Sequence, residues 1–110
     1  MKNDSKYLLP YFPLNLSVIE AFDFIEHPIL LLEHDDLGNF YLSYLSSLDS
    51  ESEFRIYVQL SKERLNDVLN NIISVYDTFT QAENNIIYLV NYDLDSGDVL
   101  KAYLMPSYEV

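Results

Sequence analysis

Apolar and polar residues alternate at every second position in the middle of the chain. In the clearest case, residues 54–60, one side of an extended chain would carry the apolar side chains Phe54, Ile56, Val58 and Leu60. The other side would carry Arg55, Tyr57 and Gln59. A period of two predicts a strand with one buried face and one face in water. Apolar stretches rich in β-branched and aromatic residues predict five further strands, at 18–25, 29–34, 40–45, 86–92 and 99–105.

The period changes after Ser61. Apolar residues now recur three or four positions apart, at Leu65, Val68, Leu69, Ile72, Tyr76 and Phe79. This spacing predicts a helix with one apolar stripe, and Ser61 is a suitable N-cap. Asn70-Asn71 is a weak point, and Ser74 with Asp77 three residues later could cap a second helix. The pattern is therefore compatible with one bent helix or two short ones.

The order of elements predicts the fold class. Gly38 and Gly97 lie in polar segments typical of tight turns between strands. Four strands, a helical segment and two more strands predict an α+β domain. We expect an antiparallel sheet, built from a four-strand meander and a C-terminal hairpin, with the helix packed on one face. Residues 1–110 are expected to form a single domain whose first 16 residues, with Pro10 and Pro13, are an irregular arm.

The charge is strongly one-sided. Eighteen acids face six bases, and the formal net charge is −12. No Lys or Arg occurs between Lys6 and Arg55, whereas nine carboxylates do. Such a field repels nucleic acid and anionic lipid and attracts basic surfaces. Direct binding to nucleic acid or to a membrane is therefore disfavoured, although an acid excess also serves solubility alone.

Most catalytic and metal-binding classes find no support in the sequence. The chain has no cysteine, and its two glycines are too few for a phosphate-binding loop. His34 lies between Glu33 and Asp35, but in a strand it points to the opposite face. Asp93 and Asp95 begin a calcium-loop pattern whose later ligands are missing. We expect no enzymatic activity, metal or cofactor, and we expect a soluble cytosolic protein because neither a signal peptide nor a long apolar segment is present.

Acids and tyrosines are the candidate binding residues. The acids are Glu33, Asp35, Asp36, Asp49, Glu51 and Glu53, and the tyrosines that could anchor a partner are Tyr41, Tyr44 and Tyr57. Carboxylates two positions apart on a strand are spaced by about 6.6 Å. DNA carries a phosphate charge about every 3.4 Å along each strand. Rows of acids could therefore offer a basic groove a comparable density of anions.

Several short motifs resemble a bacterial protein family. They are Pro28-Ile29-Leu30-Leu31-Leu32, Gly38-x-Phe40-Tyr41-Leu42, Ser61-x-x-Arg64-Leu65 and Ile73-Ser74 before Glu83. Over residues 18–83 this pattern is similar to a family of small uncharacterised bacterial proteins, a domain of unknown function. The family carries a glycine at its mid-helix break, where this chain has Asn70-Asn71. The resemblance implies the order of strands and helix and no activity.

These observations predict a non-enzymatic, acidic binding protein. It would occlude a basic site on another protein, such as a nuclease or another host-defence or nucleic-acid-handling component, in the cytoplasm of a bacterial host. In size and acidity the chain is similar to phage-encoded inhibitors and DNA-mimic proteins. The alternative is a structural module that assembles into a homodimer or larger homo-oligomer through sheet edges or exposed Tyr and Leu side chains.

Overall fold

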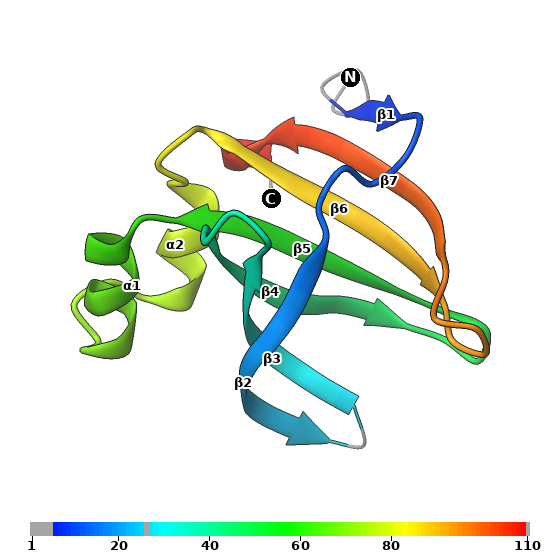
Figure 1. The fold of residues 1–110 in the computed structure, drawn as a ribbon, viewed down its shortest axis with the longest axis horizontal. Coiled ribbons are helices and arrows are strands. Elements are labelled where there is room, and N and C mark those ends of the chain that lie inside the picture. The colour runs from blue at the N-terminus through cyan, green and yellow to red at the C-terminus, as the bar shows by residue number, and fades with distance from the viewer. Residues whose placement is uncertain (1–5, 26, 110) are drawn as a thin grey trace.

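A seven-stranded antiparallel sheet organises the chain in the computed structural model, which describes residues 6–25 and 27–109 (Figure 1). The strands are β1 (Tyr7–Leu9), β2 (Leu16–Ile25), β3 (His27–Asp35), β4 (Phe40–Leu48), β5 (Ser52–Leu60), β6 (Ile86–Asp93) and β7 (Val99–Pro106). The helices are α1 (Lys62–Leu69), α2 (Val75–Thr80) and a short 3₁₀ helix, η2 (Ser107–Glu109). The predicted α+β class with an antiparallel sheet is confirmed.

Strands that follow each other in sequence are neighbours in the sheet, with one exception. The order is β1-β7-β6-β5-β4-β3-β2, which contains the predicted meander of β2 to β5 and the hairpin of β6 and β7. The exception is β1, which pairs with β7 at the edge farthest from β2. The prediction that the whole arm is irregular is therefore wrong, because residues 7–9 form ladder hydrogen bonds with residues 102–104. Residues 1–5 of that arm lie outside the described residues.

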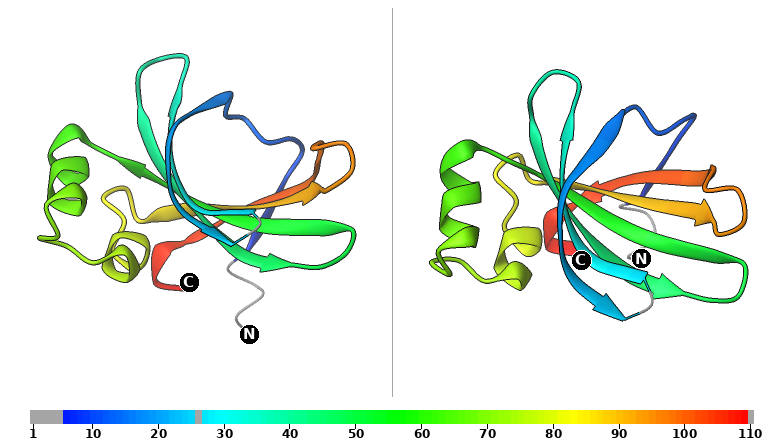
Figure 2. Two further views of the ribbon diagram at one scale, coloured as in Figure 1. Left: turned by 90° about the horizontal axis from the view of Figure 1, so that it is seen from below. Right: turned by 60° about the horizontal axis from the view of Figure 1, so that its bottom comes forward.

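The sheet curls, and the arm spans its concave side. Residues 10–15 leave β1, cross in front of β6 and β5, and enter β2 at the opposite edge (Figures 1 and 2). Register shifts between β2 and β3, and between residues 45 and 47 of β4, mark β-bulges. Because bulges bend a strand and increase its twist, they favour this curl. The ring of Phe12, in the arm, packs against the rings of Tyr57 and Tyr88. Its centroid lies 5.4 Å from that of Tyr57 and 5.8 Å from that of Tyr88.

The convex face carries the apolar core. Even-numbered residues of β3, β4 and β5 pack there with side chains of both helices; the buried members are Leu30, Leu32, Leu42, Val58, Leu60, Leu65, Phe79, Ala82 and Ile87. Because alternate residues of a strand point to the same face, the period of two assigns these strand side chains to one layer. The helices contribute Leu65 and Phe79 from the apolar stripe.

Two short helices form in place of one bent helix. Ser61 caps α1 by accepting the amide of Arg64, and Ser74 caps α2 by accepting the amide of Asp77. Between them, the Ile72 amide donates to the carbonyl of Asp67 and the Asn71 amide donates to that of Val68. These are the two bonds of a Schellman termination, which requires a left-handed residue. Asn71 supplies it with φ of 59°.

Glu83 fixes the start of α1 to the segment after α2. The amide and the hydroxyl of Ser61 both donate to its carboxylate, at 2.8 and 2.7 Å. Burial acts to raise the pKa of Glu83, but these two bonds and the nearby Arg64 outweigh it, and the pKa is lowered.

In the part of the chain that the structure describes, neither α1, α2 nor any other helix has the length and apolarity needed to traverse a lipid bilayer.

Candidate functional site

The six acids predicted to bind a partner do not share one face. Glu33 and Asp35 are buried on the concave side, Glu53 is half-buried, and Asp36, Asp49 and Glu51 are exposed. Asp36 lies in the turn after β3, whereas Asp49 and Glu51 lie in the turn after β4. The nine residues of β4 separate these turns by about 26 Å. The expectation that these residues form one anionic surface is therefore wrong.

Two of these acids stabilise turns. The Asp35 carboxylate accepts the amides of Leu37 and Asn39 at 2.9 and 2.8 Å, and the Asn39 side-chain amide at 2.9 Å. The hydrogen bond from the Asn39 side chain is the main cause that lowers the pKa of Asp35. Asp49 likewise accepts the amides of Glu51 and Ser52, which lower its pKa. Short polar side chains that bond nearby amides are typical of turns.

The three predicted tyrosine anchors are also dispersed. Tyr41 and Tyr57 are buried on the concave side, and each is only 3% exposed. Tyr44 is 42% exposed, but it lies on the opposite face of the sheet, where its ring is 6.4 Å from that of Phe79. The face of β5 predicted to be in water is covered because the arm lies over it, with Phe12 against Tyr57.

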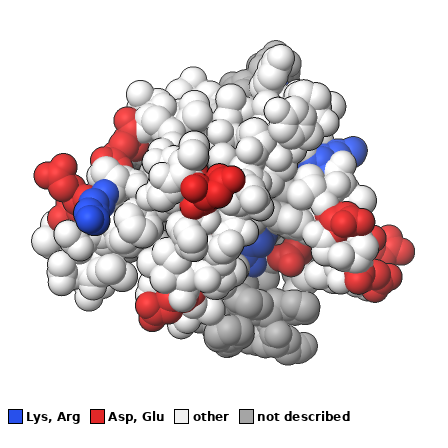
Figure 3. Space-filling model, in the orientation of Figure 1, with Lys and Arg blue, Asp and Glu red and all other residues white. Residues whose placement is uncertain are grey.

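A different set of acids does come together. The Leu94 amide donates to the Glu51 carbonyl at 2.9 Å, and Ser52 pairs with Asp93, so the turn after β4 lies beside the turn after β6. We call the five acids of these two turns the acidic tip; they are Asp49, Glu51, Asp93, Asp95 and Asp98. Figure 3 shows acidic groups gathered at this end of the sheet. Gly97, with φ of 77°, closes the second turn as predicted.

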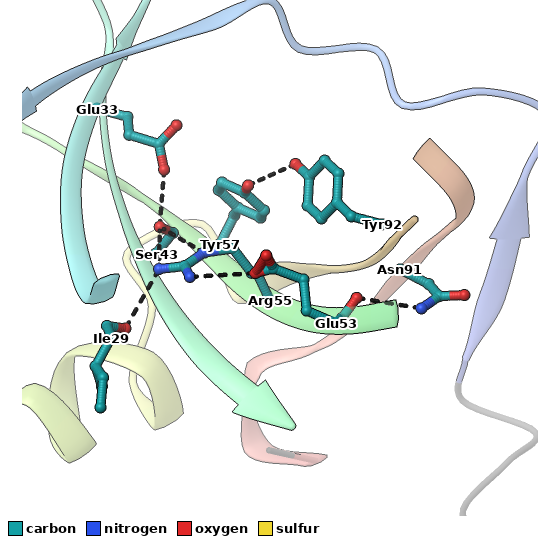
Figure 4. Close-up of polar contacts among 8 residues, drawn as sticks. All are labelled: Ile29, Glu33, Ser43, Glu53, Arg55, Tyr57, Asn91 and Tyr92. Carbon is teal, nitrogen blue, oxygen red and sulfur yellow. Dashed lines mark hydrogen bonds and ion pairs between the residues drawn. The ribbon is translucent and has the colours of Figure 1, made fainter. Parts of the chain in front are cut away.

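A buried polar cluster lies on the concave face next to the acidic tip (Figure 4). Arg55 donates to the Ser43 hydroxyl from Nε and Nη2, at 3.3 and 3.2 Å, and Nη2 also donates to the Ile29 carbonyl at 3.3 Å. Its Nη1 lies 3.5 Å from Glu53 Oε2. The Ser43 hydroxyl in turn donates to Glu33 Oε2 at 2.7 Å. Six residues make up this group, which we call the polar cluster: Glu33, Ser43, Glu53, Arg55, Tyr57 and Tyr92.

Burial governs the ionisation of this cluster. It raises the pKa of Glu33, although the Ser43 hydrogen bond and Arg55 act in the opposite direction. It also raises the pKa of Tyr92 to about 12 and raises that of Tyr57. The two phenol oxygens share a hydrogen bond. Both tyrosines are therefore neutral at physiological pH.

The polar cluster borders an open hollow of about 370 Å³. Leu31, the segment Asp93–Leu94 and Gly97 complete its wall. Ser43 is fully buried, so its hydroxyl cannot reach a molecule in the hollow and serves to join Glu33 to Arg55. Among the described residues, no three His, Asp or Glu side chains converge as metal ligands. The arrangement is suited to binding by charge and hydrogen bonds.

A family model matches residues 10–105 of the chain, and its description is a family of unknown function, DUF6575. The chain belongs to this family. The resemblance to an uncharacterised family is thus confirmed, over a longer stretch than the motifs at 18–83 indicated. No curated protein and no solved structure matches the chain. The acidic tip and the polar cluster both lie within the part that the DUF6575 model covers.

Sequence reasoning named Glu33, Glu53 and Tyr57 as candidate binding residues but missed that they form one cluster with Arg55, although one signal for it was present. Arg55 is the one cation of β5, it lies between the apolar residues Phe54 and Ile56, and it shares a face with Tyr57. Its partners come from neighbouring strands: Ser43 pairs with Tyr57, and Glu33 pairs with Tyr41. The register between strands brings Glu33 close to Arg55, and that register is not visible in a single sequence.

Proposed function

We propose that this member of DUF6575 is a non-enzymatic binding protein whose acidic tip engages a basic surface on a partner protein. The observation that carries the proposal is the pairing of two turns, which brings five carboxylates to one end of the sheet. The nearest cations along the two hairpins are Lys101, three residues after Asp98, and Arg55, four residues after Glu51 and already paired with Glu53. Local negative charge therefore dominates there.

The physics of such a tip favours fast, salt-dependent association. Charges of one sign, gathered within about a Debye length of 8 Å, act together on an approaching basic surface. A protein groove that binds the phosphates of nucleic acid has the matching charge, and it is the kind of target we propose. The acids that tie the turns together keep their carboxylates in place, which lowers the ordering cost on binding.

The experiment compares two variants with equal net charge. The tip variant is E51Q/D95N/D98N, which leaves the turn-stabilising Asp49 intact. The control variant is E20Q/D36N/E63Q, which removes three exposed acids elsewhere. Each is used to capture proteins from nuclease-treated lysate at low and high salt, and the affinity of the recovered protein is then measured by calorimetry.

We expect the tip variant to bind the recovered partner at least about tenfold more weakly than the control at low salt. We also expect wild-type binding to weaken steeply as salt rises. Equal loss in both variants, or binding that salt does not change, would overturn the proposal.

An exposed sheet edge favours a second candidate function, assembly into a homo-oligomer. The edge strand β2 leaves one row of backbone groups unpaired within the sheet, and Val18 and Ile19 on it are exposed. An open edge is a template for pairing with another chain. Light scattering over a hundredfold range of concentration, about 5 to 500 µM, tests this. A monomer throughout that range eliminates self-assembly.

A further inference from the structure

The charges around the hollow are unbalanced. Three carboxyl groups, those of Glu33, Glu53 and Asp93, line it together with the single guanidinium of Arg55. Arg55 already donates to the Ser43 hydroxyl and the Ile29 carbonyl and pairs with Glu53. An anion entering the hollow would compete with these acceptors and meet the three carboxyl groups. The hollow therefore disfavours anions and favours a cation.

Glu33 offers this cation an oxygen. One carboxyl oxygen accepts the Ser43 hydroxyl, and Figure 4 shows the other directed away from Ser43. That second oxygen makes no hydrogen bond among the described residues. Among those residues, every side-chain oxygen or nitrogen that is fully buried has a hydrogen-bond partner. Because the second oxygen of Glu33 has none, it is not fully buried and keeps access to the space in front of it. Glu33 is otherwise buried, and a bound cation would add a second positive charge to that of Arg55, which already acts on this carboxyl group.

The walls of the hollow suit the rest of a basic side chain. Leu31 and Leu94 provide apolar surface, and Tyr57 and Tyr92 provide aromatic rings. Lysine and arginine have an apolar stem and a charged head, and cations are attracted to aromatic rings. The volume of about 370 Å³ is at the small end of ligand pockets, which span roughly 300–1,000 Å³. One side chain fits such a space, whereas a folded segment does not.

The hollow also continues the acidic tip, because Asp93 belongs to both. We propose that the hollow binds the side chain of an arginine or lysine, which the partner inserts as the acidic tip draws its basic surface close. The statement that a partner protein supplies this side chain rests on the proposed function. Binding of the cationic group by the hollow does not, and it is tested separately.

The experiment titrates the full-length protein with N-acetyl-arginine amide and follows backbone amides by NMR. N-acetyl-citrulline amide, a neutral molecule of the same shape, is the matched control ligand, and sodium phosphate tests for anion binding. We expect saturable shifts in β5 and β6 around Arg55, Tyr57 and Tyr92 with the arginine or the corresponding lysine probe. Equal shifts with citrulline, or shifts with phosphate alone, would overturn the proposal.

Variants assign the binding to the hollow. Glu33→Gln keeps an acceptor for Ser43 but removes the charge, and Glu53→Gln removes the charge beside Arg55. We expect each to weaken binding of the arginine probe by about tenfold. Glu51→Gln removes an exposed charge from the acidic tip and should leave probe affinity within about twofold of wild type. An unchanged affinity in both Glu33→Gln and Glu53→Gln, with folded NMR spectra, contradicts the proposal.

The outcomes separate the two proposals. If the acidic tip variant loses the partner while the arginine probe fails to bind, the proposed function stands and the cation site falls. If the probe binds in the hollow but neither tip charge nor salt affects partner capture, the cation site stands and the proposed function falls. Should Glu33→Gln unfold the protein, Glu53→Gln alone decides whether the charge of the hollow binds the probe.

Discussion

The two faces of β5 are stabilised by different kinds of interaction. On the convex face, Val58 and Leu60 join a continuous apolar core with the helices. On the concave face, Arg55 and Tyr57 are almost as deeply buried as Val58 and Leu60, yet they are held by hydrogen bonds and ion pairing. One strand therefore contributes alternate residues to a dry core and to a polar cluster.

The difference shows how a small acidic domain combines stability with a binding site. Apolar burial on the convex face stabilises the sheet without any directional requirement. The concave face needs every polar group to be matched, because a buried group without a partner is strongly destabilising. Among the described residues, no fully buried side-chain oxygen or nitrogen lacks a partner, and the second carboxyl oxygen of Glu33 is accessible where the hollow begins. The face held by polar contacts thus provides the site.

Arg55→Met should have the largest effect. It leaves Glu53 without its ion-pair partner, removes the positive charge that acts on Glu33, and removes the donors that hold Ser43. Breaking a buried ion pair by removing one partner costs about 3–5 kcal/mol, so we expect a loss of about 4 kcal/mol in the free energy of unfolding. Urea unfolding followed by circular dichroism measures it. A loss below about 1 kcal/mol would mean that the cluster contributes little to stability.

The double variant R55M/E33Q tests whether that loss comes from uncompensated charge. If it does, neutralising Glu33 should recover roughly half of the stability lost on removing Arg55, because the two side chains act in one network. Additive losses in the double variant would instead mean that the packing of the Arg55 side chain is what matters.

Leu42→Ala tests the convex face in the same assay. Leu42 is 1% exposed in the apolar core, and removal of such a side chain costs about 2–5 kcal/mol. We expect a loss of about 3 kcal/mol that does not change between pH 5 and pH 8, because no charge is involved. Leu37→Ala is the matched control, since Leu37 is exposed in the turn after β3 and its loss should cost less than about 0.5 kcal/mol.

Local patterns were sufficient to predict the six strands from β2 to β7 and the start of α1, but not β1. Each depends on neighbours within a few residues: alternation around Val58, the cap at Ser61, and the turn at Gly97. The break at Asn71 was visible as a weak point, but only the observed hydrogen bonds of Ile72 and Asn71 settle that two helices form.

The candidate site was less predictable because it depends on long-range contacts. The wet face predicted for β5 assumed that nothing covered it, whereas the arm crosses that face and Phe12 packs on Tyr57. The acids were predicted to act together because they are close in sequence. Instead, Glu51 joins Asp93 across the sheet, about forty residues away along the chain. Pairing of strands and the path of the arm decide these contacts, and neither has a local signature.

Phe12→Ala should weaken the cover of the concave face. The ring is partly buried between Tyr57 and Tyr88, so its loss should be smaller than for a core phenylalanine, about 2 kcal/mol. Leu8→Ala, an exposed position in β1, is the control within the same region and should cost less than about 0.5 kcal/mol. Urea unfolding compares them, and similar small losses for both would show that the arm adds little to the concave face.

Glu33→Gln has the smallest expected effect and the most specific signature, which is its dependence on pH. Burial raises the pKa of Glu33 in the folded protein above 4.5, so the native state holds the proton more tightly than the unfolded chain. Its contribution to stability is therefore largest below about pH 4.5 and declines as the pH rises through the raised pKa. Glutamine cannot ionise, so the variant lacks this decline.

The other acids, including Asp35 with its lowered pKa, are common to both proteins and cancel in the comparison. We expect the free energy of unfolding of Glu33→Gln, relative to wild type, to increase from about pH 4.5 to about pH 7, as measured by urea titrations at closely spaced pH. A relative stability that falls over this range would show that Ser43 and Arg55 outweigh burial at Glu33.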